Sequence, residues 1–115
     1  MLQISPEKVA HIILYAREID ANYGGFSEGE ADGDSAVADL REFIANLNED
    51  EKASLVALMW IGRETFGADE LDEAIETARA EATAPTEDYL TGVPLLADYL
   101  EGGLSELGIS LEDIE

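Results

Sequence analysis

The stretch LNEDEKASLVALMWIGR, residues 47–63, constrains the fold more than any other part of the sequence. It opens like a helix start, because the Asn48 side chain can accept a hydrogen bond from the backbone of Glu51 while Glu51 reaches back to Asn48. From residue 53 onward, apolar side chains occupy nearly every side of the helix. A helix that is apolar nearly all round has to be enclosed by other elements, so the sequence predicts this third helix at the centre of a bundle.

Amphipathic segments that could enclose this helix lie on both sides of it. The first begins with Ser5 as a cap and Pro6 at the first helical position. No segment alternates apolar and polar residues over the length of a strand. The predicted fold class is therefore all-α, a single helical domain over residues 1–115 in which about five to six helices form a bundle. Its last residues, 109–115, are expected to form a loosely held tail.

Glycine and proline mark the predicted boundaries. Residues 24–34 hold four glycines among acidic side chains, which predicts a flexible acidic loop. Gly67 is expected to end the third helix in a left-handed conformation. The last helix is expected to have Pro94 at its first position and Gly108 just after its end. Gly103 falls on the apolar side of that helix, which predicts direct backbone contact with a neighbouring helix.

The charge balance narrows the classes of partner. Acidic side chains outnumber basic ones by 27 to 6, for a formal net charge of −21. Binding to nucleic acid or to an anionic membrane surface depends on Lys and Arg, so neither is expected. The charge is typical of a solvated or salt-adapted surface, and it can also attract a basic protein. The sequence has no cysteine, signal-peptide pattern or apolar run of membrane-spanning length, so a cytoplasmic location is expected.

Residues 28–39, EGEADGDSAVAD, have some features of a calcium-binding loop. Acidic groups stand at its first, third, fifth and seventh positions, and Gly33 stands at the sixth. However, the twelfth position is Asp39, where a bidentate Glu is needed, and the eighth is Ser35 rather than an apolar anchor. Divalent-metal binding through this loop is one alternative function, and a solvated loop is the preferred interpretation.

No catalytic set emerges from the sequence. His11 is the only histidine and is expected at the surface, and with 27 carboxylates the proximity of any two carries little information. We therefore expect no enzyme, and assign no catalytic residue, cofactor or metal ligand. The alternative is an enzyme or small-ligand binder, with carboxylates around an inter-helix pocket near Tyr89 or Tyr99.

Trp60 and Arg63 are the remaining candidates for a functional role. They are three residues apart, so they can share a helix face on which the guanidinium stacks over the indole. The preferred interpretation is a core tryptophan bordered by an arginine that pairs with an acid. An interface is the second interpretation, since aromatic residues and arginine are common interface anchors. The candidate interface residues are Trp60, Arg63, Tyr89 and Tyr99.

Three stretches resemble a bacterial family of small acidic proteins, the domain of unknown function 3775. They are LNEDEKASLVALMWIGR, DEAIETARAEA and TEDYLTGVPLLADYLEGGLSELG. The resemblance covers essentially the whole chain after its first few residues and is weakest in the glycine-rich loop. It implies an intact domain, and it brings no activity, cofactor or partner with it.

The acidic surface, the surplus of apolar helix faces and the lack of a catalytic set together favour a non-enzymatic protein-interaction module. Its partner would be a second copy of the chain, in a homo-oligomer, or a basic protein.

Overall fold

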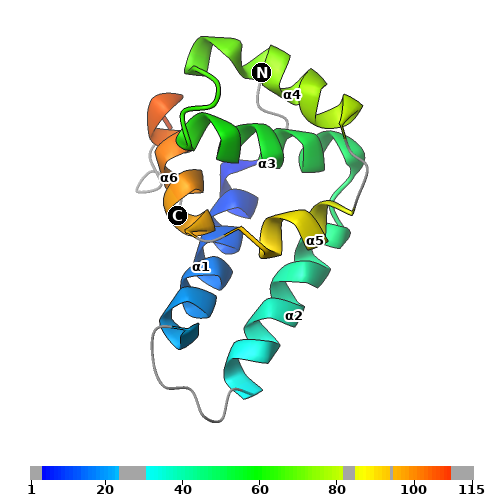
Figure 1. Ribbon diagram of the computed structural model, residues 1–115, viewed down its shortest axis with the longest axis vertical. Coiled ribbons are helices and arrows are strands. Elements are labelled where there is room, and N and C mark those ends of the chain that lie inside the picture. Colours follow the sequence, from blue (N-terminus) through cyan, green and yellow to red (C-terminus); the bar gives the residue numbers. More distant parts are fainter. Residues whose placement is uncertain (1–3, 24–30, 82–84, 94, 110–115) are drawn as a thin grey trace.

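The fold is an all-α bundle, as predicted. The computed structural model describes residues 4–23, 31–81, 85–93 and 95–109, and in these ranges it contains six α-helices, one 3₁₀ helix and no β-strand (Figure 1). The helices are α1 (Pro6–Tyr23), α2 (Ala31–Ala45), α3 (Glu49–Gly62), η1 (Ala68–Glu70), α4 (Leu71–Ala80), α5 (Thr86–Thr91) and α6 (Leu96–Glu106). None of the helices in the described ranges combines the length and the apolar character needed to cross a membrane.

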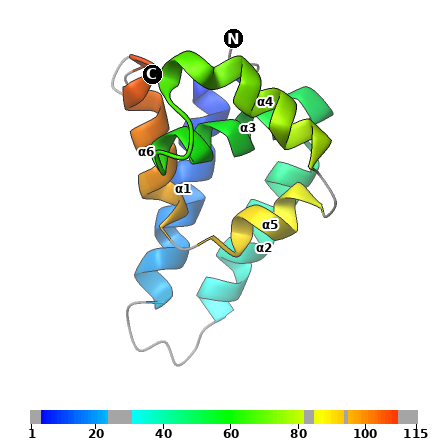
Figure 2. The same ribbon diagram turned by 45° about the horizontal axis from the view of Figure 1, so that its top comes forward.

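The central position of α3 is confirmed. It packs against α4 on one side and against α6 and α5 on others, while α1 and α2 form a hairpin that extends away from it (Figures 1 and 2). Every residue from Ala53 to Met59 is buried, and so is Ile61. Because these side chains leave α3 in all directions, they form the core that the surrounding helices share.

The crossing of α3 and α6 is close enough to require glycine on both helices. A Cβ atom at Gly62 would overlap the backbone oxygen of Tyr99 and lie 2.6 Å from its carbonyl carbon. A Cβ atom at Gly103 would overlap the backbone oxygen of Leu58 and lie 2.9 Å from its Cδ1 atom. The backbone contact predicted for Gly103 is thus confirmed, and its partner is the central helix.

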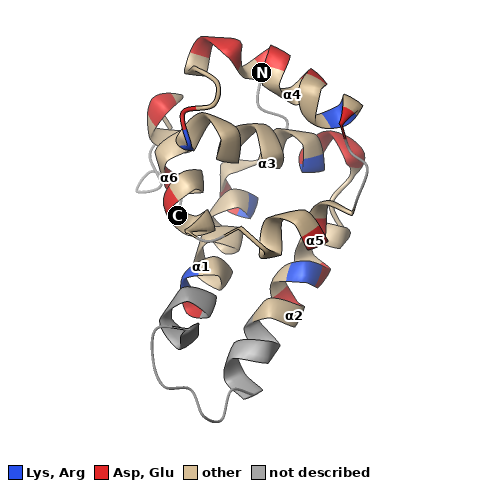
Figure 3. Cartoon of the chain, in the orientation of Figure 1, with Lys and Arg blue, Asp and Glu red and all other residues tan. Residues whose placement is uncertain are grey.

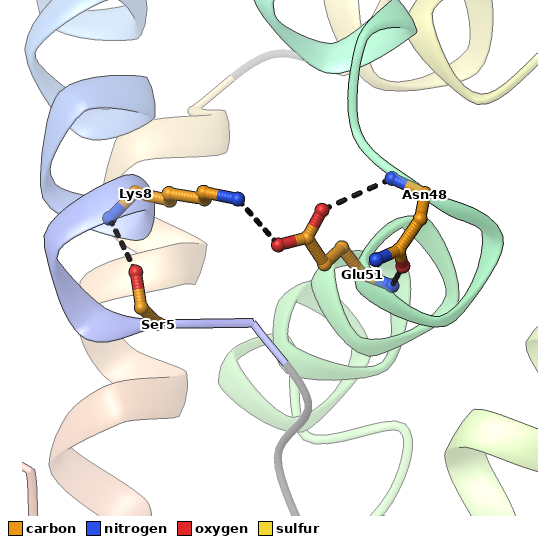
Figure 4. A network of polar contacts seen from close by, with 4 residues as sticks. All are labelled: Ser5, Lys8, Asn48 and Glu51. Atoms are coloured by element: carbon orange, nitrogen blue, oxygen red, sulfur yellow. Dashed lines mark hydrogen bonds and ion pairs between the residues drawn. The ribbon is translucent and has the colours of Figure 1, made fainter.

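Several helix ends also agree with the sequence. The Ser5 Oγ accepts a hydrogen bond from the N–H of Lys8 at 3.2 Å, at the start of α1. The predicted capping box is present, since the N–H of Glu51 donates to Asn48 Oδ1 at 2.7 Å and the N–H of Asn48 donates to Glu51 Oε1 at 3.0 Å (Figure 4). Gly108 has the left-handed conformation expected after the last helix, with φ 77°.

The predicted end of α3 at Gly67 is wrong. The helix ends at Gly62, and Glu64 takes the left-handed conformation with φ 68°, whereas Gly67 is extended with φ −87° and ψ 166°. The N–H of Thr65 donates to the carbonyl of Trp60 at 2.9 Å, which closes the turn as a Schellman motif. Gly62, the last residue of α3, lies against the backbone of Tyr99 in α6, so α3 ends where the two helices cross.

The loop predicted at 24–34 is wrong for its last four positions. Helix α2 begins at Ala31, so the last four positions of that range are helical, and residues 24–30 lie outside the described part of the chain. Gly33 is therefore inside a helix, where one glycine costs only about 1 kcal/mol relative to alanine. A glycine at position 33 was therefore no reason to exclude a helix there.

The start of α6 differs from the prediction as well. The helix begins at Leu96, and Leu95 before it has a left-handed backbone with φ 62°. Pro94, the predicted first position, lies outside the described residues. Of the tail predicted at 109–115, Ile109 packs against the core and its N–H donates to the carbonyl of Leu104 at 2.8 Å. The rest of that tail is not among the described residues.

Candidate interaction surface

Three aromatic side chains meet where α3 ends near α5. The indole Nε1–H of Trp60, in the last turn of α3, donates to the phenol oxygen of Tyr89 on α5 at 3.2 Å. Phe66 stacks on the same indole, with 5.7 Å between ring centroids and 29° between ring planes. Tyr89 is 39% exposed, and the other two rings are partly buried. We call Trp60, Phe66 and Tyr89 the aromatic cluster.

Two local features position this cluster. The turn that ends α3 reverses the chain within a few residues, which brings Phe66 back onto the indole. Helix α5, which carries Tyr89, is anchored by the fully buried side chain of Leu90 and by an ion pair from Asp88 to Arg41 of α2. The rings are therefore held by the core and by a neighbouring helix.

Phe66 was not among the residues that the sequence marked as interface candidates. Helical periodicity continued to this position places it on a different face of the helix from Trp60. Only the turn that begins after Gly62 makes the two rings neighbours. The sequence carries no local signal for that turn, because the left-handed position in it is a glutamate.

Arg63 does not make the predicted contacts. It is exposed, and its Nε donates weakly to the hydroxyl of Thr65 at 3.5 Å. Within the described part of the chain, it forms neither a stack on Trp60 nor an ion pair with an acid. The indole is instead stacked against Phe66, and the tryptophan predicted for the core is only partly buried against it.

Tyr99 also lies apart from the cluster. Its side chain is partly buried against the core on α6, and its backbone oxygen faces Gly62 of α3. No described contact joins its ring to the rings of the aromatic cluster. Of the four candidate interface residues, the structure thus brings together Trp60 and Tyr89 and leaves Arg63 and Tyr99 outside.

Most of the basic side chains form ion pairs between different helices. Four of the six Lys and Arg residues form ion pairs, and each pair joins two different helices. The pairs are Lys8–Glu51 (α1 to α3), Arg17–Glu101 (α1 to α6), Arg41–Asp88 (α2 to α5) and Arg79–Asp50 (α4 to α3). Exposed pairs of this kind add little stability individually. Their consequence is that few cations remain to offset the acidic positions, which spread over the described helices in Figure 3.

One of these pairs lowers the pKa of its carboxylate. The Nζ of Lys8 donates to Glu51 Oε2 at 2.5 Å, while Glu51 Oε1 accepts the N–H of Asn48 (Figure 4). The hydrogen bond from Lys8, and after it that from Asn48, holds the pKa of the Glu51 carboxyl below its ordinary value. This carboxylate therefore serves the structure, because it fastens the start of α1 to the start of α3.

Residues 37–109 match the model of the family described as Protein of unknown function (DUF3775). The chain belongs to the DUF3775 family. The match covers more than half of the chain and includes α3 to α6 with all three residues of the aromatic cluster. Comparisons with curated proteins and with solved structures gave no match.

The calcium-loop interpretation of residues 28–39 does not hold in this DUF3775 protein. A loop of that kind folds its backbone around the ion, whereas residues 31–39 lie in the continuous helix α2. Residues 28–30 are outside the described part of the chain. Among the described residues, no three His, Asp or Glu side chains are grouped as metal ligands.

His11 lies at the surface, as predicted, and contacts an aromatic ring. It is exposed on α1, and its imidazole meets the ring of Phe43 edge-on, with 5.9 Å between centroids. Tyr15 approaches the same phenylalanine from the next turn, at 6.0 Å. Both contacts lie between α1 and α2, so His11 has a packing role.

Proposed function

We propose that this DUF3775 protein is a non-enzymatic protein-interaction module that binds a basic partner protein in the cytoplasm. The proposal rests on how the few Lys and Arg side chains of the protein are engaged. Four of six are engaged in ion pairs between helices, on a chain whose net charge is −21. The surface that a partner meets is therefore dominated by carboxylates, which attract a cationic protein over a distance and favour its encounter.

Charge also distinguishes the two partners that the sequence left open. A second copy of the chain carries the same net charge of −21, so like charges oppose self-association. A basic partner relieves that repulsion. For this reason the proposal favours a basic protein over a homo-oligomer.

Two measurements test this function. Size-exclusion chromatography with light scattering is expected to show a monomer at physiological salt. The immobilised protein is then expected to capture a basic protein from lysate, which should bind again when purified and reach a fixed stoichiometry. A strict monomer that captures no basic protein in this way would count decisively against the proposal.

A charge series makes the test quantitative. The exposed carboxylates of Glu73 and Glu76 lie on α4 and take part in no ion pair in the described part of the chain, so Glu73→Gln and Glu76→Gln are expected to leave the fold intact. The double variant should bind the captured partner more weakly and with a shallower dependence on salt concentration. Substitution of Ser105 by Gln, also exposed but uncharged, provides the control for side-chain size. Equal salt dependence in all three proteins would contradict an electrostatic basis.

A further inference from the structure

We infer that the aromatic cluster is the place where the partner docks, and that the partner supplies an arginine side chain which packs against the exposed edge of the cluster. This inference rests on the proposed function, because it names the site and the recognised group for the same basic partner.

Two exposed hydrophobic side chains belong to the segment that carries Tyr89. In the described part of the chain, three large hydrophobic side chains are exposed, and two of them, Tyr89 at 39% and Leu95 at 51%, belong to α5 and the segment that leads from it to α6. Tyr89 is held to Trp60 by the indole hydrogen bond. Exposed aromatic surface that is anchored in this way is typical of a binding site rather than of a solvated helix face.

The rings are also fixed before any partner arrives. Phe66 stacks on one side of the indole, and the phenol oxygen of Tyr89 occupies the indole N–H. Leu90, next to Tyr89, is fully buried and holds α5 in place. A surface that needs no reordering loses little conformational entropy on binding, which favours affinity.

Two carboxylates lie at the residue that follows the cluster in the sequence. Directly after Phe66, Glu70 Oε1 accepts the N–H of Gly67 at 2.7 Å. The carboxylate of Asp69 lies against the same glycine, 2.9 Å from the place of a Cβ atom. Two cations close to the cluster along the chain or through a neighbouring residue already have other partners, since Arg63 donates to Thr65 and Arg41 pairs with Asp88, the neighbour of Tyr89. Aromatic rings beside carboxylates are an environment in which a cationic group gains both cation–π and ionic attraction.

Arginine suits this surface better than lysine. Its planar guanidinium can stack on a ring while its N–H groups donate to carboxylates, whereas the lysine ammonium is a strongly hydrated point charge. Nucleobases also stack on aromatic rings, but the accompanying phosphates would be repelled by a chain of net charge −21.

The test compares nona-arginine with nona-lysine by isothermal titration calorimetry, with the fluorescence of Trp60 as a local reporter, since it is the only tryptophan. We expect nona-arginine to bind roughly three- to ten-fold more tightly and to perturb the emission of Trp60. Tyr89→Leu and Phe66→Leu should abolish this preference. The control Tyr15→Leu on α1, which removes a ring outside the aromatic cluster, should retain it. Circular dichroism and thermal melting establish that each variant is folded.

The outcomes separate the site from the function. An arginine preference that disappears only in Tyr89→Leu and Phe66→Leu supports the inference. Equal binding of both peptides, or a preference that survives both of these variants, overturns the docking site and leaves the proposed acidic interaction function standing. Failure of both peptides to bind at low salt overturns the site and the proposed function together.

Discussion

Helices α3 and α6 cross each other at the centre of the molecule, yet their ends are built in opposite ways. Helix α3 starts with the capping box of Asn48 and Glu51 and ends through Glu64 in a left-handed conformation. Helix α6 starts after Leu95 in a left-handed conformation, with no side-chain cap, and ends through Gly108. Each helix thus has one end that suits its residues and one end that costs conformational energy.

This difference shows that packing between helices takes precedence over the backbone conformation that the residue at a helix end prefers. Both helices use glycine at the crossing, at Gly62 and Gly103, because any Cβ atom there would collide with backbone. Just after α6, a further glycine, Gly108, takes the left-handed position. In α3 the turn follows two residues after Gly62, and Glu64 has to adopt a conformation that costs an L-residue about 1 to 2 kcal/mol.

A substitution at the crossing of α3 and α6 should have the largest effect on stability. Gly62→Ala would drive a methyl group into the backbone of Tyr99 and to within 2.8 Å of the N atom of Gly103. Because backbone cannot move aside as a flexible side chain can, we expect a loss of about 3 kcal/mol or more in the free energy of unfolding, measured by urea denaturation.

The neighbouring glycine provides the matched control. At Gly102 a Cβ atom would lie 3.5 Å from the Cα of Gly62, which is ordinary contact. Alanine also suits a helix interior better than glycine, so Gly102→Ala should leave stability unchanged or raise it by up to about 1 kcal/mol. If Gly62→Ala and Gly102→Ala behaved alike, the close crossing of α3 and α6 would be refuted.

The well-formed start of α3 should give the next largest effect. Asn48→Ala removes the side-chain oxygen that accepts the N–H of Glu51 at 2.7 Å, and should cost about 1 kcal/mol in thermal or urea unfolding. Asn46, two residues earlier, is exposed and lies before the cap position. Asn46→Ala should therefore change stability by no more than a few tenths of a kcal/mol. A loss of equal size at both positions would mean that the cap is not what stabilises this end.

These helix ends also show what the sequence can and cannot predict. Asn48 with Glu51 and Gly108 act through their immediate neighbours, so spacing alone identified the start of α3 and the end of α6. The apolar run through residues 53–61 likewise identified the central helix. The end of α3 was mispredicted because Gly67 looked like the terminating glycine, whereas the helix ends at Gly62, where it meets a helix more than 30 residues later in the sequence.

The candidate site was less predictable than the fold. Trp60 and Tyr89 are 29 positions apart, and no periodicity relates them, although both were marked as aromatic anchors. Phe66 joins them only through the misjudged turn. The ion pairs could not be predicted from the sequence either, because each cation has 27 acidic residues as potential partners. The packing of the helices determines which of them lies within reach.

The favourable end of α6 can be made to resemble the costly end of α3. Gly108→Ala places a side chain at φ 77°, with no atom within 4 Å of its Cβ, so the effect is one of backbone conformation and not of crowding. The left-handed penalty, partly offset by the lower entropy of the unfolded chain, should cost about 1 kcal/mol. Urea unfolding with an unchanged m-value would be the expected signature. A neutral result would mean that the last turn of α6 is not maintained in solution.

At the end of α3, replacing the left-handed Glu64 by glycine should instead raise the free energy of unfolding, and by a smaller amount. Glu64→Gly relieves the left-handed strain but increases the entropy of the unfolded chain, so a net stabilisation of about 0.5 kcal/mol is expected. Glu64→Ala keeps the strained backbone and removes the carboxylate, and should resemble the wild type. If Glu64→Ala stabilised the protein as much as Glu64→Gly, then charge repulsion rather than backbone strain would be the cost at this end.

The smallest effect concerns the ion pair that joins the start of α3 to α1, and it depends on pH. Glu51→Gln keeps an oxygen for the N–H of Asn48 but loses the charge that pairs with Lys8, so the expected loss is a few tenths of a kcal/mol at neutral pH.

The pKa of Glu51 is lowered in the folded protein, so its ionised form stabilises the fold above the pKa of the unfolded chain. This contribution disappears as the pH falls through the lowered pKa. The stabilities of wild type and Glu51→Gln should therefore converge in acid. Glu49→Gln, at a more exposed carboxylate of the same helix turn, is the control for the loss of one negative charge and should leave the stability at neutral pH nearly unchanged. A difference between wild type and Glu51→Gln that persisted in acid would show that the amide disturbs the capping box itself and that the ion pair with Lys8 adds nothing to the start of α3.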